Sequence, residues 1–326
     1  MDSQWLRYFR LIVTDGGDSE NALDLSDFRV RFHISQRVVG KPTTAEIFIN
    51  NVSQDTINAI RTPTNQFLSS SRPKVVIEAG YQSDHAMIFQ GDLWWKSTGR
   101  ESETETFLRL IAATGDRVQN FSVVSASIPK GATQSQVFET VAKSMEEEGV
   151  PGPQTMPAMQ EGRLPRGKVI YQPSAQAMNG LADTNDFSWG YGTNGLITVP
   201  KKPTFDGNAP VIVLTAATGL VGRPKMTVEG VTLQCLLNPR IDVGTLIQID
   251  NRSIQRDAYD TAVGASIEKS RSTTNDFVGA DGIYSVISRE FSGDTRGTEW
   301  YANLVAVAVY GSKPVSPTIA TTFPNM

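Results

Sequence analysis

Alternation of apolar and polar residues with a period of two dominates the chain and predicts β-strands. The clearest case spans residues 28–35, where four apolar residues that begin with Phe28 alternate with four polar ones that begin with Arg29. Because successive side chains of a strand point to opposite faces, we predict one buried apolar face and one cationic face in water or in ion pairs. Comparable runs bounded by turn residues predict further strands. They are residues 5–14, 43–50, 73–81, 86–95, 104–114, 211–214, 227–237, 245–249, 282–289 and 299–310.

The pattern changes to a helical period after residue 128. Thr133 and Gln136 have the spacing of a capping box, which predicts a helix over residues 134–148 that Gly149 and Pro151 end. Its apolar positions form one stripe. They are Val137, Phe138, Val141, Ala142 and Met145.

Three shorter features complete the predicted elements. Ser53 is expected to cap a short helix over residues 54–61, and Ser174 is expected to cap a helix that runs to Asp183. The dipeptide Asn194-Gly195 favours a type I′ turn within a hairpin over residues 187–200. The second helix is expected to turn its apolar residues to the core. They are Ala177, Met178, Leu181 and Ala182.

This order of elements predicts a mainly β (α+β) fold with two antiparallel β-barrel domains and a small α/β module between them. We place an N-terminal barrel at residues 1–126, the α/β module at 127–204, a C-terminal barrel at 205–310 and an extended arm at 311–326. Residues 251–276 form a polar insertion of mixed charge, expected to be a surface loop or a subunit contact. It contains Arg252, Arg256, Asp257, Asp260, Glu268, Lys269 and Arg271.

Composition narrows the classes of function. The chain has 326 residues, 39% of them hydrophobic, and its 30 Lys and Arg against 34 Asp and Glu give a net charge of −4. This balance provides no broad basic field and disfavours general nucleic-acid binding. The sequence has no apolar run of the roughly 18–20 residues that a membrane span needs, and its polar start does not resemble a signal peptide. We therefore expect a soluble protein made in the cytoplasm.

The single cysteine and the two histidines are the first candidates for catalysis. Cys235 lies in an apolar strand and is either a functional thiol or a small core residue; the core interpretation is favoured because only His33 and His85 could act as bases. A Ser-His-Asp triad needs one of these histidines, and no Gly-x-Ser-x-Gly motif supports it. One cysteine and two distant histidines also give no metal-binding spacing, and no glycine-rich phosphate loop is present.

Cell-wall hydrolysis would require a pair of carboxylates. Glu46, Glu78 and Glu299 lie in or beside predicted strands and are more simply outward-facing residues. The run Glu146 to Glu148 at a helix end is typical of a solvated surface. We therefore predict no catalytic, cofactor-binding or metal-binding residues.

The most cationic strand region of the N-terminal half contains Arg29, Arg31, Arg37 and Lys41. Two interpretations remain open. The favoured one is a solvated or ion-paired strand face, and the other is a contact with an acidic partner.

Several segments in a fixed order resemble a known family. Residues 47–53, 75–81, 88–93 and 108–115 are similar to the first barrel of phage tail hub proteins, and residues 219–250 and 282–301 resemble the final block of the same family. The resemblance covers nearly the whole chain, and the baseplate hubs of contractile-tailed phages are the nearest match.

The resemblance implies a structural role without enzymatic activity. Three chains with two related barrels each would form a pseudo-sixfold ring that joins the hexameric tail tube to the trimeric spike and gates the channel for DNA and the tape measure protein. The implied partners are two further copies, the tube, spike and tape measure proteins and neighbouring baseplate proteins, with DNA passing through the lumen without specific binding. The implied location is the virion.

Two alternatives come from other functional classes. Some relatives carry a fused lysozyme domain, so a tail-associated cell-wall hydrolase is one, although no catalytic motif for it is present. A spike component of a type six secretion system is the other, and the lack of β-helix repeats after residue 311 counts against it.

Overall fold

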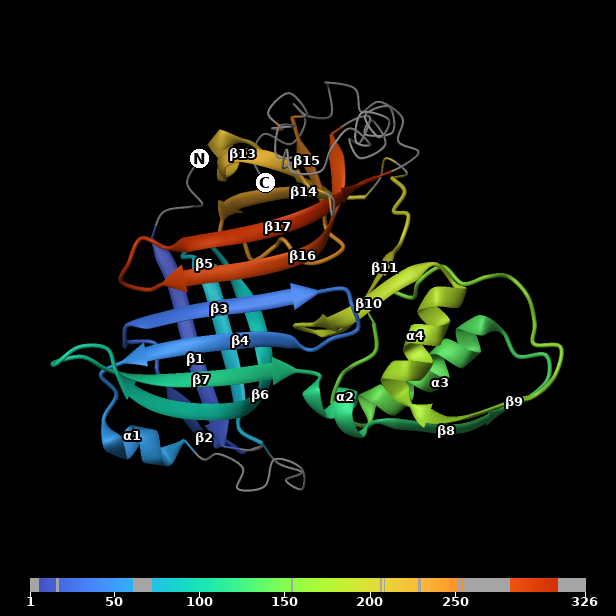
Figure 1. Ribbon diagram of the computed structural model, residues 1–326, viewed down its shortest axis with the longest axis horizontal. Helices are drawn as coiled ribbons and strands as arrows, with labels where there is room; N and C mark the ends of the chain where they lie inside the picture. The colour runs from blue at the N-terminus through green and yellow to red at the C-terminus, as the bar shows by residue number, and fades with distance from the viewer. Residues whose placement is uncertain are drawn as a thin grey trace, which may run out of the picture.

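The computed structural model describes residues 6–15, 18–60, 72–153, 155–205, 207, 209–227, 230–250, 254 and 282–309. The mainly β, antiparallel fold predicted from the sequence is confirmed. Figure 1 shows a strand-rich body and, to one side, a smaller part that contains helices α2, α3 and α4. The charged residues of the predicted insertion 251–276 and the predicted arm 311–326 lie outside the described residues.

The elements fall into three consecutive groups. The first is β1 Arg7–Asp15, β2 Asp18–Asp24, β3 Val30–Arg37, β4 Thr43–Asn50, α1 Gln54–Ala59, β5 Lys74–Tyr81, β6 Asp84–Arg100 and β7 Thr106–Thr114. The second is α2 Asp116–Phe121, β8 Val123–Ile128, α3 Gln134–Glu146, β9 Lys168–Pro173, α4 Ser174–Thr184, β10 Phe187–Gly192 and β11 Gly195–Pro200. The third is β12 Val211–Leu214, the 3-10 helix η1 Ala216–Thr218, β13 Leu220–Thr227, β14 Gly230–Leu236, β15 Leu246–Ile249, β16 Ile283–Asp294 and β17 Trp300–Ala308.

One sheet of 13 described strands contains both the first and the third group. Its main path runs β13-β14-β17-β16-β3-β4-β7-β6-β5-β1-β2, and β15 branches from β16 to pair in parallel with β12. The link between the groups is the antiparallel pairing of β3 with β16, from Arg31 opposite Asp294 to Arg37 opposite Ser288. We call this pairing the seam (Figure 1). The two predicted β regions therefore share one continuous sheet.

The seam follows from the alternation seen in the sequence. Val30, Phe32 and Ile34 on β3 are at most 3% exposed and face the core, as predicted. Phe32 packs edge-on against Trp300 of β17, with ring centroids 5.5 Å apart, and stacks on Phe9 of β1 at the same separation. One hydrophobic core thus includes residues from both ends of the chain.

A second core lies among α2, α3, α4 and the neighbouring strands. The predicted capping box is confirmed, because Thr133 accepts from the Gln136 amide and the Gln136 side chain accepts from the Thr133 amide. All five predicted stripe residues of α3 and all four of α4 are buried. Ser53 also caps α1 as predicted.

Tight backbone contacts attach this second core to the sheet. The amide of Gly40, after β3, donates to the Trp189 carbonyl of β10 at 2.8 Å, and the Thr43 hydroxyl donates to the Tyr191 carbonyl at 2.6 Å. Gly115, between β7 and α2, has a φ of 81°, and a Cβ there would lie 2.3 Å from the Tyr191 ring. Only glycine fits this position, because it must both adopt the left-handed conformation and admit the ring.

Two local predictions were wrong. Ser174 does not cap α4, because Pro173 holds that position; instead the Ser174 hydroxyl is buried, 2.7 Å from the hydroxyls of Ser122 and Ser144. The β10–β11 turn is centred one residue earlier than predicted, since Gly192 pairs with Gly195, and Asn194 does not have the positive φ of a type I′ turn.

Several elements were not predicted. β2, β8, β9, β13 and α2 were not assigned, while β16 continues five residues past the predicted end at Arg289 to Asp294. Among the described residues, no helix is long and apolar enough to span a membrane.

Candidate functional site

The structure places Cys235 where a nucleophile cannot operate. It lies in β14, is 1% exposed and belongs to the main hydrophobic core. Burial raises the pKa of its thiol to about 12. The thiol is therefore protonated at neutral pH, and Cys235 acts as a small core residue.

The two histidines occupy separate structural positions. His33 is exposed on the outer face of β3, and the pairing places it opposite Glu46 of β4. His85 of β6 stacks on Tyr8 with ring centroids 3.8 Å apart, and its Nδ1 lies 3.3 Å from the Tyr81 carbonyl oxygen. Neither histidine forms a hydrogen bond with a serine or carboxylate side chain within the described parts of the chain, so no triad is assembled there.

The carboxylates considered for hydrolysis are also dispersed. Glu46 on β4 is ion-paired with Arg109 at 2.6 Å, while Glu78 on β5 accepts from the Tyr8 hydroxyl at 3.4 Å. Two strands lie between β4 and β5, which separates them by about 14 Å, beyond the spacing of a glycosidase pair. The carbonyl of Glu299 accepts from the Asp294 amide in the β16–β17 turn. No group of three potential metal ligands occurs among the residues that the structure describes.

The arginines on β3 and directly before it are neutralised within the chain. Arg29 pairs with Asp294 at 2.8 Å, Arg31 with Glu101 at 2.8 Å and Arg37 with Glu290 at 3.2 Å. Of the two interpretations left open by the sequence, the geometry supports the ion-paired strand face for these three arginines. Lys41 is exposed.

A network of hydrogen bonds ties β1 to the turn that follows the seam. The Arg7 guanidinium donates to the carbonyls of Asp294, Gly297 and Thr298 at 2.7 to 3.1 Å. Burial alone would raise the pKa of the Asp294 carboxyl, but hydrogen bonds from Arg29 and the Arg296 amide outweigh it and lower that pKa. The carboxylate is therefore charged, and it joins the first and third groups of elements electrostatically.

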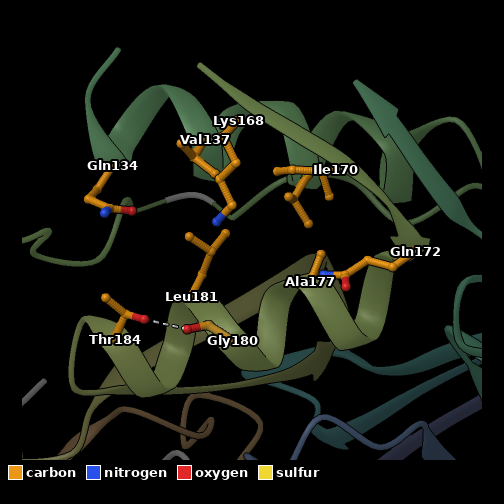
Figure 2. Close-up of a pocket in the computed structure, with 10 residues that line it drawn as sticks. Gln134, Val137, Lys168, Ile170, Gln172, Ala177, Gly180, Leu181 and Thr184 are labelled. Carbon is orange, nitrogen blue, oxygen red and sulfur yellow. Dashed lines mark hydrogen bonds between the residues drawn. The ribbon is translucent and has the colours of Figure 1, made fainter. Parts of the chain in front are cut away.

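A groove of about 300 Å³ lies between α3, α4 and β9. Figure 2 shows Lys168 extending over the groove, with Val137 and Ile170 on one side and Leu181 on the other. Lys168 is the only titratable residue in its lining, so the groove contains no acid and base pair. Its lining mixes apolar side chains with the polar Gln134, Gln172 and Thr184 and one cation, Lys168.

Large apolar side chains are exposed on the outer face of the β8–β9 ribbon. Val169 is 78% exposed and Tyr171 is 80% exposed, and Val123 on the neighbouring strand is 51% exposed. Across the ribbon, Tyr171 pairs with Ser125 and Val169 with Ser127, so these two large side chains lie opposite serines. We call this the ribbon face; exposed apolar groups gathered in this way are typical of interaction surfaces.

Comparison of the sequence with models of known protein families identifies the family of this chain. The model described as baseplate hub gp41 matches residues 11–254, which is most of the chain. The chain belongs to the baseplate hub gp41 family. Members of this family are structural proteins of the phage baseplate. The resemblance to phage tail hub proteins that the sequence predicted is therefore confirmed.

Solved structures support the fold of this hub. It aligns with the 43 kDa tail protein of prophage MuSo2 from Shewanella oneidensis with a TM-score of 0.54 and 9% identity, over 92% of this chain and 97% of that chain. A tail protein from Neisseria meningitidis MC58 aligns with a TM-score of 0.52 and 11% identity, over 92% of this chain and 96% of that chain. A chain of the Francisella PdpA–VgrG complex aligns with a TM-score of 0.51 and 7% identity, over 96% of this chain and 60% of that chain. No curated protein matches the sequence.

Proposed function

We propose that this hub is a homotrimer that joins the hexameric tail tube to the trimeric spike and gates the channel for DNA and the tape measure protein. The observation that carries the proposal is the seam: it connects two β regions of one chain in a single sheet. Three such chains present six β regions, which is the number needed to match a sixfold tube with threefold symmetry.

The division of labour within the chain follows from its two cores. The shared core of the sheet supports a ring-building role for the proposed domains at residues 1–126 and 205–310. The second core supports a separate module, and because it includes Val118 and Val124 it starts before the proposed boundary of residues 127–204. Because Val169 and Tyr171 of the ribbon face belong to this module, we place it on the outside of the ring or toward the spike, where baseplate partners dock.

The channel role is supported by charge. A ring that passes DNA must not bind it tightly, and a chain with a net charge of −4 whose β3 arginines are ion-paired does not provide a cationic phosphate track. We propose assembly in the host cytoplasm and a final location in the virion, without enzymatic activity. The fold similarity to the PdpA–VgrG chain favours a secretion-system spike component as the second candidate.

Light scattering of the purified chain, alone and with its tube and spike proteins, tests the proposal. The expected particle has a mass of about 106 kDa, three times the 35.5 kDa of one chain. A monomer under every condition would contradict it. An image of the tube-to-spike junction in assembled particles would distinguish the two candidates, and loss of turbidity of purified peptidoglycan with the protein alone would show a hydrolase instead.

A further inference from the structure

Two polar side chains lie side by side on the buried face of the seam. Gln36 of β3 and Arg289 of β16 are direct partners in the antiparallel register, and each residue is only 2% exposed. Gln36 continues the inward-facing positions of Val30, Phe32 and Ile34. The pair therefore lies inside the protein at the opposite end of the seam from Asp294.

The positive charge of Arg289 is only partly compensated. Its Nη1 donates to the Ile241 carbonyl at 2.9 Å and lies 3.5 Å from the Asp242 carboxylate. A charged N–H donor and a carboxylate normally approach to about 2.7–2.9 Å, so this ion pair is loose. The Asp242 carboxylate also accepts from the Val243 amide at 2.6 Å, and its side chain is 40% exposed.

The other edge of the same guanidinium has no hydrogen-bond partner among the described residues. Nε and Nη2 of Arg289 are buried and donate no hydrogen bond to the described residues, and Nε2 and Oε1 of Gln36 are buried and form none either. In arginine, Nε–H and one Nη–H point the same way and form a fork that binds an anion with two parallel hydrogen bonds. The ring of Phe291, 4.5 Å away, covers the face of the guanidinium and leaves this edge free.

We propose that the Nε–Nη2 fork of Arg289 and the Nε2 amide of Gln36 form a buried binding site for a small monovalent anion of chloride size. A guanidinium is always charged in proteins, and a buried charge without a counter-ion is strongly unfavourable. Water would satisfy the donors without neutralising the charge, whereas an anion does both. The bound ion would fix β3 to β16 from the core side, independently of any assembly into a ring.

The first test is structural. Crystals of the full chain grown in sodium bromide should give an anomalous peak within hydrogen-bond distance of Arg289 Nε and Nη2. Water density at this position in bromide, or no density, would overturn the proposal.

The second test measures thermal unfolding at constant ionic strength, with chloride replaced stepwise by gluconate, which is too large for a buried site. The melting temperature should rise with chloride by about 2–4 °C and saturate. An identical melting temperature in both salts would contradict the site.

Variants at the two positions separate the site from general salt effects. Gln36→Glu keeps the shape of the side chain and supplies a carboxylate to the fork, so it should remove the chloride dependence and leave the protein at least as stable. Arg289→Met should also remove the dependence. Arg37→Met, on the outer face of the same strand, is the matched control and should keep the full chloride response. An unchanged chloride response in Gln36→Glu would exclude this location for the ion.

Discussion

The two ends of the seam hold an arginine in different ways. At one end, the Arg29 side chain is 39% exposed and lies 2.8 Å from the carboxylate of Asp294, which accepts further hydrogen bonds from backbone amides. At the other end, the Arg289 side chain is 2% exposed and lies 3.5 Å from Asp242. Bulk water can solvate the exposed Arg29 guanidinium but does not reach the buried Arg289 guanidinium. At the exposed Asp294 end, one close ion pair is enough to stabilise the charge of the arginine. At the buried Arg289 end, the charge requires a further counter-ion.

The largest effect is expected from the apolar packing beside the Asp294 end. Trp300→Ala should lower the free energy of unfolding by about 3–5 kcal/mol, because the ring is 1% exposed and packs against Phe9 and Phe32. Urea unfolding measures this change. Trp95→Ala is the control, since Trp95 is 51% exposed and should cost far less. Equal losses in the two variants would show that the Trp300 cluster does not anchor the seam.

Asp294→Asn should cost about 1.5–3 kcal/mol at neutral pH, because it removes the charged acceptor of Arg29. The pKa of this carboxyl is lowered in the folded protein, so its contribution is present above the unfolded value of about 3.9 and is lost as the pH falls through the folded value. Unfolding measured from pH 7 to pH 2 should therefore show a smaller acid-induced loss in the variant. Parallel pH profiles would contradict this role.

Gly293→Ala should cost about 1–3 kcal/mol through overpacking. A Cβ at Gly293 would lie 2.5 Å from Phe32 Cζ and 2.8 Å from Trp300 Cε3. The matched control is Gly180→Ala on α4, where a Cβ meets nothing within 4 Å, so helix propensity should make that variant slightly more stable. Thermal unfolding distinguishes the opposite signs, and a neutral Gly293→Ala would mean that the two rings can separate.

The smallest effect is expected for Arg37→Met, which should change stability by less than about 0.5 kcal/mol. The Arg37 side chain is 58% exposed and its pair with Glu290 is 3.2 Å long, so solvent screens the interaction. A urea titration in low and high salt measures it. A loss of stability as large as that of Asp294→Asn would show that the Arg37–Glu290 pair contributes as much as the Arg29–Asp294 pair.

Sequence patterns predicted the elements whose two faces differ most. β3 and α3 were found because an apolar face alternates with a polar one or because a capping box marks the start. β9 was missed because Val169 and Tyr171 occupy outward positions and erase the alternation, whereas β8 does alternate over residues 124–128 but is only six residues long. Ser174 was misassigned because a serine before a helix usually caps it, whereas here its hydroxyl serves two other serines.

The candidate site was less accessible to sequence reasoning than the fold. The pairing of β3 with β16 joins residues about 255 positions apart, and no local pattern specifies such a partner. One signal was available: extending the alternation of residues 28–35 by one more residue places Gln36 at an inward position, which marks an unusual buried amide. Its partner Arg289 could not have been identified without the register.

The seam also sets the order in which the chain can fold on the ribosome. At about 5–20 residues per second, β16 emerges roughly 13–50 s after β3, and until then the backbone of β3 has one unpaired edge. Such an edge is open to pairing with other chains. The nascent hub therefore exposes this edge of β3 until β16 is made, and any fragment that stops before β16 is expected to aggregate through β3.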